Sequence, residues 1–246
     1  MNYTIIIQGP LEKHSIDGIN NYLKYGKVLV STWDYIDTSA IPNTVKKIVK
    51  PLPDISKSVG TISNFYYAVC GMQNALDVID TEYFVRTRGD EVYKNLDNLI
   101  ETFESNTNKI VFGNMFARSW DDRPLHIGDH LYVGKTEIGR TAFKYLRDMY
   151  EGREKLEQWA VQGGQDYNPR TNRHHSSEAE VVLAKTFLHS KNIEVNDWYD
   201  KSMFLDNFSI IDINSTQEFI SSWQNGNQVY RNNFINPHNV KTILDI

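Results

Sequence analysis

Cysteine is nearly absent from this chain, which contains a single one, Cys70, among 246 residues. One thiol cannot form an internal disulfide, so the sequence excludes a disulfide-stabilised fold and favours a reducing compartment. No apolar run approaches membrane-spanning length, and no basic region followed by an apolar stretch opens the chain. We therefore expect a soluble, cytoplasmic protein without a transmembrane segment.

Blocks of positive charge are absent as well. The formal net charge is -5 and no segment is rich in Lys and Arg, so nucleic acid is not an expected partner. No Gly-x-Gly-x-x-Gly motif follows the first expected strand and no complete P-loop motif occurs, which argues against dehydrogenases and P-loop enzymes. With 40% hydrophobic residues, however, the chain can bury the core of one large domain.

The sequence alternates short apolar runs with helical patterns. Strands are expected at residues 3–7, 28–30, 45–49, 83–87, 109–116, 131–134 and 208–213. Helices are expected at 20–25, with Ser15 or Asp17 as the cap, from 58 or 61 to 79, and at 96–103. A further helix is expected after Thr136, which caps it, and a last one ends near residue 188. This order predicts an α/β fold with a mostly parallel sheet flanked by helices. We expect one domain overall, formed by residues 1–195, with residues 196–246 packed on it as an irregular C-terminal extension.

The most informative stretch is residues 83–91. It begins with aromatic and β-branched residues that favour a buried strand, and it ends in a glycine followed by two acids, the first of which is Asp90. Alternation along the strand places Arg86 and Arg88 on one face. Acids at the carboxyl end of a strand lie where open α/β sheets bind ligands, and cations beside them suit a site for a metal and a phosphate. An ordinary solvated ion pair at the end of a strand would show the same pattern.

Two more strands end in polar residues. The first stops at Gln8 and Gly9, and the second leads into residues 32–34. Because parallel strands place their carboxyl ends at the same edge of a sheet, we expect these residues to meet Asp90.

Three segments together resemble the WavE-type lipopolysaccharide glycosyltransferases and related transferase domains of large algal viruses. They are the strand that ends in Gln8-Gly9-Pro10, residues 29–34 and residues 85–90. Residues 128–134 and a later acidic helix start match the same pattern, so the likeness covers residues 3–193. The resemblance implies a GT-A-like fold, a nucleotide-diphosphate sugar as donor with UDP-sugars foremost, a glycan or other hydroxyl acceptor, and Mn²⁺ or Mg²⁺.

The resemblance also implies roles for individual residues. Asp90 stands where the last acid of an Asp-x-Asp motif binds the metal on the donor diphosphate, and Arg88 replaces the first acid. Relatives often carry an Arg-Gln pair near the start of the long helix, where this chain has Asn64 and Phe65, so Arg86 or Arg88 is expected to contact the diphosphate instead. The residues that would surround the nucleoside are Gln8, Gly9, Pro10, Thr32, Trp33 and Asp34.

An inverting transferase needs a base for the acceptor hydroxyl, and two acids compete for that role. Glu178 opens the late helix, where many inverting GT-A enzymes carry their base, and Asp129 lies between a glycine and a histidine. Each also has a structural explanation, as a first-turn helix acid and as a turn former. A retaining enzyme would need neither. The histidines that could complete a metal shell are His126, His130, His174 and His175.

Two other functions remain open from the sequence. A sugar-nucleotidyltransferase uses a similar sheet, but it normally carries a glycine-rich loop with Lys or Arg after the first strand, which Gln8-Gly9-Pro10-Leu11 matches poorly. A degenerate transferase fold that serves as a carbohydrate-binding or scaffolding module is the non-enzymatic alternative, because only one acid stands at the metal position.

Overall fold

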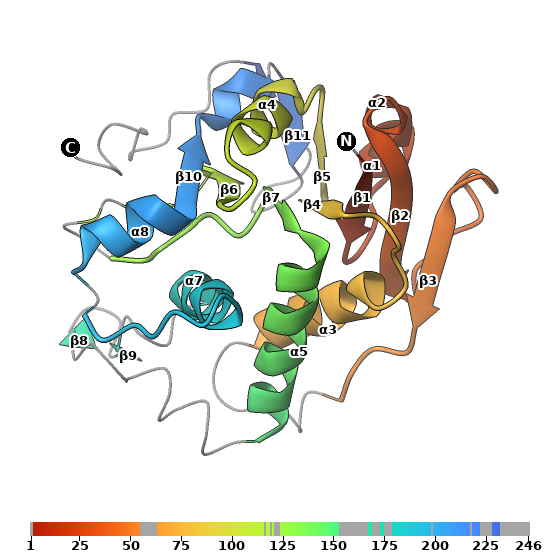
Figure 1. Ribbon diagram of the computed structural model, residues 1–246. Coiled ribbons are helices and arrows are strands. Elements are labelled where there is room, and N and C mark those ends of the chain that lie inside the picture. Colours follow the sequence, from red (N-terminus) through yellow and green to blue (C-terminus); the bar gives the residue numbers. More distant parts are fainter. Residues whose placement is uncertain are drawn as a thin grey trace.

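The structure is a computed structural model that describes residues 2–54, 63–115, 117–118, 120, 124–152, 167–168, 173–174, 179–197, 199–216, 218–221 and 228–231. Its centre is a seven-stranded sheet with helices on both faces (Figure 1). In spatial order the strands are β10 (Phe208–Ile211), β6 (Ile110–Gly113), β7 (Tyr132–Lys135), β4 (Tyr83–Arg88), β1 (Tyr3–Gln8), β2 (Gly26–Trp33) and β3 (Lys46–Lys50).

All neighbouring strands of this sheet run parallel except β7, which is antiparallel to both β4 and β6. The expected α/β class with a mostly parallel sheet is therefore confirmed. Every residue of β1 is buried because helices cover both faces of the central strands, which explains its continuous apolar run.

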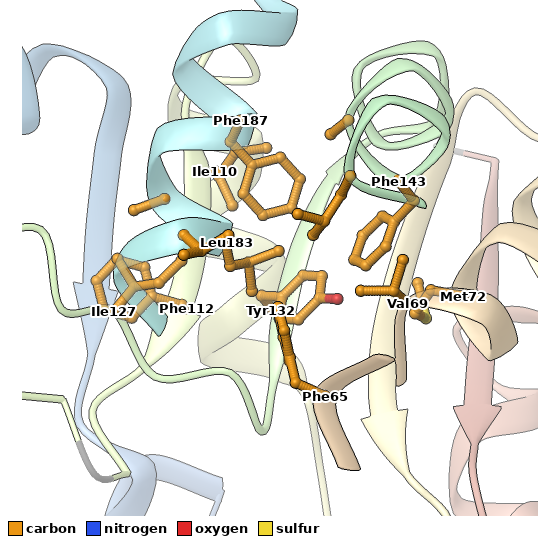
Figure 2. Packing of buried hydrophobic residues seen from close by; sticks show 14 of the residues in the cluster. Phe65, Val69, Met72, Ile110, Phe112, Ile127, Tyr132, Phe143, Leu183 and Phe187 are labelled. Carbon is orange, nitrogen blue, oxygen red and sulfur yellow. The ribbon is translucent and has the colours of Figure 1, made fainter. Parts of the chain in front are cut away.

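The sheet separates two hydrophobic cores. The helices of the larger core are α3 (Ser63–Leu76), α5 (Thr136–Glu151), α7 (Ala179–Ser190) and α8 (Lys201–Asn207). Those of the other core are α1 (Lys13–Asp17), α2 (Ile19–Leu23) and α4 (Asp97–Ser105). Figure 2 shows how Tyr132 of β7 lies between Phe143 of α5, Phe187 of α7 and Val69 of α3 in the larger core. This packing anchors one flank of the carboxyl end of β4.

Residues beyond the expected domain boundary at 195 also form strands. In addition to β10, β11 (Glu218–Ser221) pairs with β12 (Gln228–Arg231) and with β5 (Glu91–Tyr93), which directly follows Asp90. The C-terminal extension, expected to be irregular apart from a strand at 208–213, therefore also contains β11 and β12. The remaining short elements are β8 (Tyr167–Asn168), β9 (Arg173–His174) and the 3-10 turn η3 (Ile213–Thr216).

Several expected boundaries are corrected by the structure. The helix expected at 20–25 is α2, which begins at Ile19 and ends at Leu23, and a further helix, α1, precedes it. Ser15 lies inside α1, where its hydroxyl donates to the Gly89 carbonyl oxygen. β2 begins at Gly26, two residues before the expected strand, and α5 starts at Thr136 itself, with Lys135 in the N-cap position. β6 is shorter than residues 109–116. The expected caps of α3 at 58 and 61 lie outside the described residues.

Among the helices that the structure describes, none is long and apolar enough to cross a membrane.

Candidate functional site

The carboxyl ends of β2, β1 and β4 lie side by side, as the sequence predicts. Gln8 at the end of β1 stands in register with Ser31 of β2 and with Arg88 of β4. The loops that follow are joined by backbone hydrogen bonds: Gly89 N donates to Gln8 O at 2.8 Å, and Glu12 N donates to Gly89 O at 3.0 Å. A Cβ at Gly89 would lie 2.3 Å from the Pro10 carbonyl oxygen, so only glycine permits this close approach.

Arg86 is a buried cation with unused donors. Its side chain is 3% exposed, its Nη2 donates to Gln8 Oε1 at 3.1 Å, and its guanidinium lies 5.6 Å from the centre of the Tyr132 ring. Its Nε and Nη1 have no hydrogen-bond partner among the residues that the structure describes. A buried donor left unpaired costs about 1–3 kcal/mol, so Arg86 is a candidate partner for an acceptor-rich ligand.

Arg88 and Asp90 form an ion pair with two hydrogen bonds at the carboxyl end of β4. Arg88 Nε donates to Asp90 Oδ1 at 2.8 Å, and Nη2 donates to Oδ2 at 2.7 Å. The two side chains are 23% and 21% exposed, so the pair is partly shielded from water. Burial by itself would lower the pKa of Arg88, but the bond to Asp90 and the charges of Glu91 and Asp129 raise it above its usual range. Arg88 is therefore a fixed cation.

Glu91 is a fully buried carboxylate, and sequence reasoning selected its neighbour Asp90 instead. Tyr93 Oη donates to its Oε2 at 2.7 Å, and His130 Nδ1 lies 2.6 Å from its Oε1. Burial would raise the pKa of Glu91, but His130, Arg88 and the hydrogen bond from Tyr93 outweigh it and lower the pKa to about 2. Glu91 thus stays ionised and orients the His130 ring. The only signal in the sequence is its place directly after Asp90.

Asp129 belongs to the same network. Its Oδ1 lies 3.5 Å from His130 Nε2, and its side chain is 17% exposed. Burial would raise the pKa of Asp129, but the neighbouring His130, Arg86 and Arg88 lower it. The structure therefore brings together three residues that the sequence selected separately, Arg86, Arg88 and Asp129. The other candidate base, Glu178, lies outside the described residues.

The residues selected for the nucleoside differ in their exposure. Gly9 is buried with a φ of 105°, and the Thr32 hydroxyl donates to its carbonyl oxygen at 2.8 Å. Trp33 is 2% exposed and packs against Tyr67 of α3, so its ring belongs to the core rather than to an open stacking surface. Pro10 and Asp34 are exposed at the ends of β1 and β2.

The described residues do not fit a divalent ion at Asp90 as they stand. Both Asp90 carboxylate oxygens accept hydrogen bonds from Arg88, and both Glu91 oxygens contact other side chains. Within the described part of the chain, no group of three His, Cys, Asp or Glu side chains has an arrangement that could hold a metal ion. Of the histidines proposed for the metal shell, His130 contacts Glu91 and His126 Nε2 lies 3.6 Å from Glu180. The metal at Asp90 stays a prediction.

The pockets lined by residues that the structure describes do not include Arg86, Arg88 or Asp90. Two of these pockets include Lys135, which pairs with Tyr83, the first residue of β4. They therefore lie at the amino end of β4, whereas Arg88 and Asp90 lie at its carboxyl end. One of these pockets is lined by Asp80, Glu82 and Glu137, but neither pocket includes a buried arginine. The candidate site is therefore identified by its charged side chains and not by a pocket among the described residues.

No protein-family model and no curated protein sequence matches the chain, so the resemblance to the WavE-type family is not confirmed. One similar solved structure is HddC from Yersinia pseudotuberculosis, at 13% identity and a TM-score of 0.36 over 57% of this chain and 79% of that one. Another, described as a glucose-1-phosphate thymidylyltransferase from Bacillus anthracis in complex with a sucrose, gives 10% identity and a TM-score of 0.45 over 90% of each chain. At such TM-scores these likenesses carry no argument about function. The mostly parallel sheet flanked by helices is by itself consistent with a nucleotide-diphospho-sugar transferase-like fold.

Proposed function

We propose that this chain is a glycosyltransferase. It transfers a hexose from a nucleotide-diphosphate sugar, with UDP-sugars as the first candidates, to the hydroxyl of a glycan or another acceptor. The observation that carries the proposal is Arg86, a buried guanidinium whose Nε and Nη1 have no partner among the described residues. A diphosphate is rich in charged acceptor oxygens, and planar guanidinium donors bind such groups strongly.

The two fixed guanidinium groups of the site suit the departure of a nucleoside diphosphate. As the bond from the sugar to the diphosphate breaks, negative charge accumulates on the diphosphate oxygens. Arg86, held by Gln8, and Arg88, held by Asp90, are fixed before the reaction begins and stabilise that charge. The loops around Gly9 and residues 32–34 are proposed to hold the nucleoside.

Asp129 is the proposed base for an inverting reaction, with Glu178 as the competing acid. Its lowered pKa keeps Asp129 ionised at neutral pH, as a proton acceptor must be, although it also weakens the base. In this role Asp129 would accept the proton of the acceptor hydroxyl as the new glycosidic bond forms. In a retaining reaction Asp129 would instead bind hydroxyls of the donor sugar.

A thermal-shift panel tests the proposal. UDP-, GDP- and CMP-sugars are added to the wild type, to Arg86→Met and to a control variant, Glu101→Gln, which changes an exposed residue of α4. A ligand that binds only the folded state raises the melting temperature by mass action. We expect at least one nucleotide-diphosphate sugar to stabilise the wild type and the control but not Arg86→Met. Failure of every nucleotide sugar to stabilise the wild type would refute the proposal.

The same preparations separate the alternatives. A glycosyltransferase should release UDP or GDP from its donor sugar, at least slowly, with water as acceptor. A sugar-nucleotidyltransferase should instead release pyrophosphate from a nucleoside triphosphate and a sugar 1-phosphate. A carbohydrate-binding module should respond to free glycans and to no nucleotide.

A further inference from the structure

Arg88 lies among three carboxylates. Asp90 accepts two hydrogen bonds from it, Glu91 Oε1 lies 3.9 Å from its Nε, and Asp129 contributes to the field that stabilises its charge. Acids gathered around one cation form the type of environment that transferases build around a divalent ion. Here the cation is part of the chain.

A divalent ion at Asp90 would have to displace this guanidinium. The displaced Arg88 would lose both charge-assisted bonds while remaining beside the buried Glu91. Separating a partly buried pair of this kind is unfavourable because each charge loses its partner. The ion pair therefore competes directly with metal binding.

The two arginines together match what a divalent ion would supply. Arg86 and Arg88 are two positions apart on β4, so their side chains lie on the same face of the strand. On that face Arg86 contacts Gln8 and Tyr132. Two guanidinium groups carry two positive charges, as one Mg²⁺ does. Arg86 has Nε and Nη1 available, and the bonds to Asp90 use only two of the five N–H groups of Arg88.

We propose that Arg88, held by Asp90 and assisted by Arg86, takes the place of the divalent cation, so that the chain binds its donor diphosphate without a metal. This inference rests on the proposed function, because it concerns the same diphosphate. It assigns Asp90 to positioning Arg88 rather than to ligating an ion. It also explains why an arginine can replace the first acid of the motif without loss of the site.

The test measures the affinity for UDP and for GDP by calorimetry, in EDTA and in Mn²⁺. For the wild type we expect the better of the two ligands to bind with the same affinity, within about twofold, in both conditions. For Arg88→Gln we expect binding in EDTA to weaken at least tenfold, while Glu101→Gln binds as the wild type does. Arg88→Asp, which provides a second acid, should bind more tightly in Mn²⁺ than in EDTA.

Two results would overturn the inference and leave the proposed function intact. One is wild-type binding that appears only with Mn²⁺, a result that needs no variant to fold. The other is Arg88→Gln binding in EDTA as tightly as the wild type, which would make the ion pair merely structural. If neither diphosphate binds the wild type in either condition, the proposed function fails together with the inference.

Discussion

The buried carboxylate of Glu91 offers the sharpest test of the network at the site. Glu91→Gln keeps the size and shape of the side chain but removes its charge. Glutamine can still meet Tyr93 and His130 through its amide, so the substitution isolates the electrostatic contribution. A loss of stability would therefore report on the charge and not on a cavity.

The magnitude follows from the pKa of Glu91, which falls from its ordinary 4.5 to about 2 in the folded chain. At about 1.4 kcal/mol per pH unit, the ionised group stabilises the folded chain by roughly 3 kcal/mol at neutral pH. Because the folded-state pKa lies below that of the unfolded chain, this stability is present above about pH 4.5 and is lost as the pH falls toward 2.

Urea unfolding followed by fluorescence and by circular dichroism measures the effect at several pH values. At pH 7 we expect Glu91→Gln to lower the free energy of unfolding by roughly 3 kcal/mol, and Glu101→Gln, on the exposed side of α4, by less than about 0.5 kcal/mol. The deficit of Glu91→Gln should shrink by roughly 2 kcal/mol between pH 7 and pH 3. Equal stability of the two variants at pH 7, or a deficit that does not change on acidification, would refute the reasoning.

Three further predictions concern the same end of the sheet. Gly89→Ala should lower the free energy of unfolding by about 1–3 kcal/mol, because its Cβ would meet the Pro10 carbonyl oxygen at 2.3 Å; an unchanged urea midpoint would contradict this. Arg86→Met should leave the free energy of unfolding of the ligand-free chain within about 1 kcal/mol of the wild type, because removing buried unpaired donors offsets the loss of the hydrogen bond to Gln8. A larger loss in urea unfolding would show that these donors are satisfied in the folded chain. Burial raises the pKa of the Cys70 thiol, so a thiol reagent should modify it at pH 8 only after unfolding; rapid modification of the folded chain would disprove its burial.

Much of the central sheet is readable from the sequence. β1 and β4 are buried almost throughout and each contains a run of aromatic or β-branched residues, at 5–7 and at 83–85, and these runs suffice to locate the two strands. The meeting of Gln8 with Arg88 follows once the strands are taken as parallel neighbours. Helix ends were predicted less well, because the hydroxyls of Ser15 and Thr136 gave the usual capping signal at positions inside helices.

Other features depend on partners that are distant in the chain. β5 is only three residues long, and it is a strand because β11 pairs with it, a choice that no local pattern encodes. Glu91 is buried beside Tyr93, His130 and Arg88. Its importance appears only when the segment before β7 brings His130 beside it, since a carboxylate in a sequence shows neither its burial nor its neighbours.

The sequence by itself determined the α/β class and the edge of the sheet where polar residues collect, because hydrophobic periodicity and strand order are local properties. Only the tertiary structure decided how the charges are paired: Arg88 binds Asp90, His130 binds Glu91, and Arg86 keeps two donors unpaired among the described residues. Such pairing depends on distances of a few ångströms between separate strands and loops, and these distances exist only after the chain has folded.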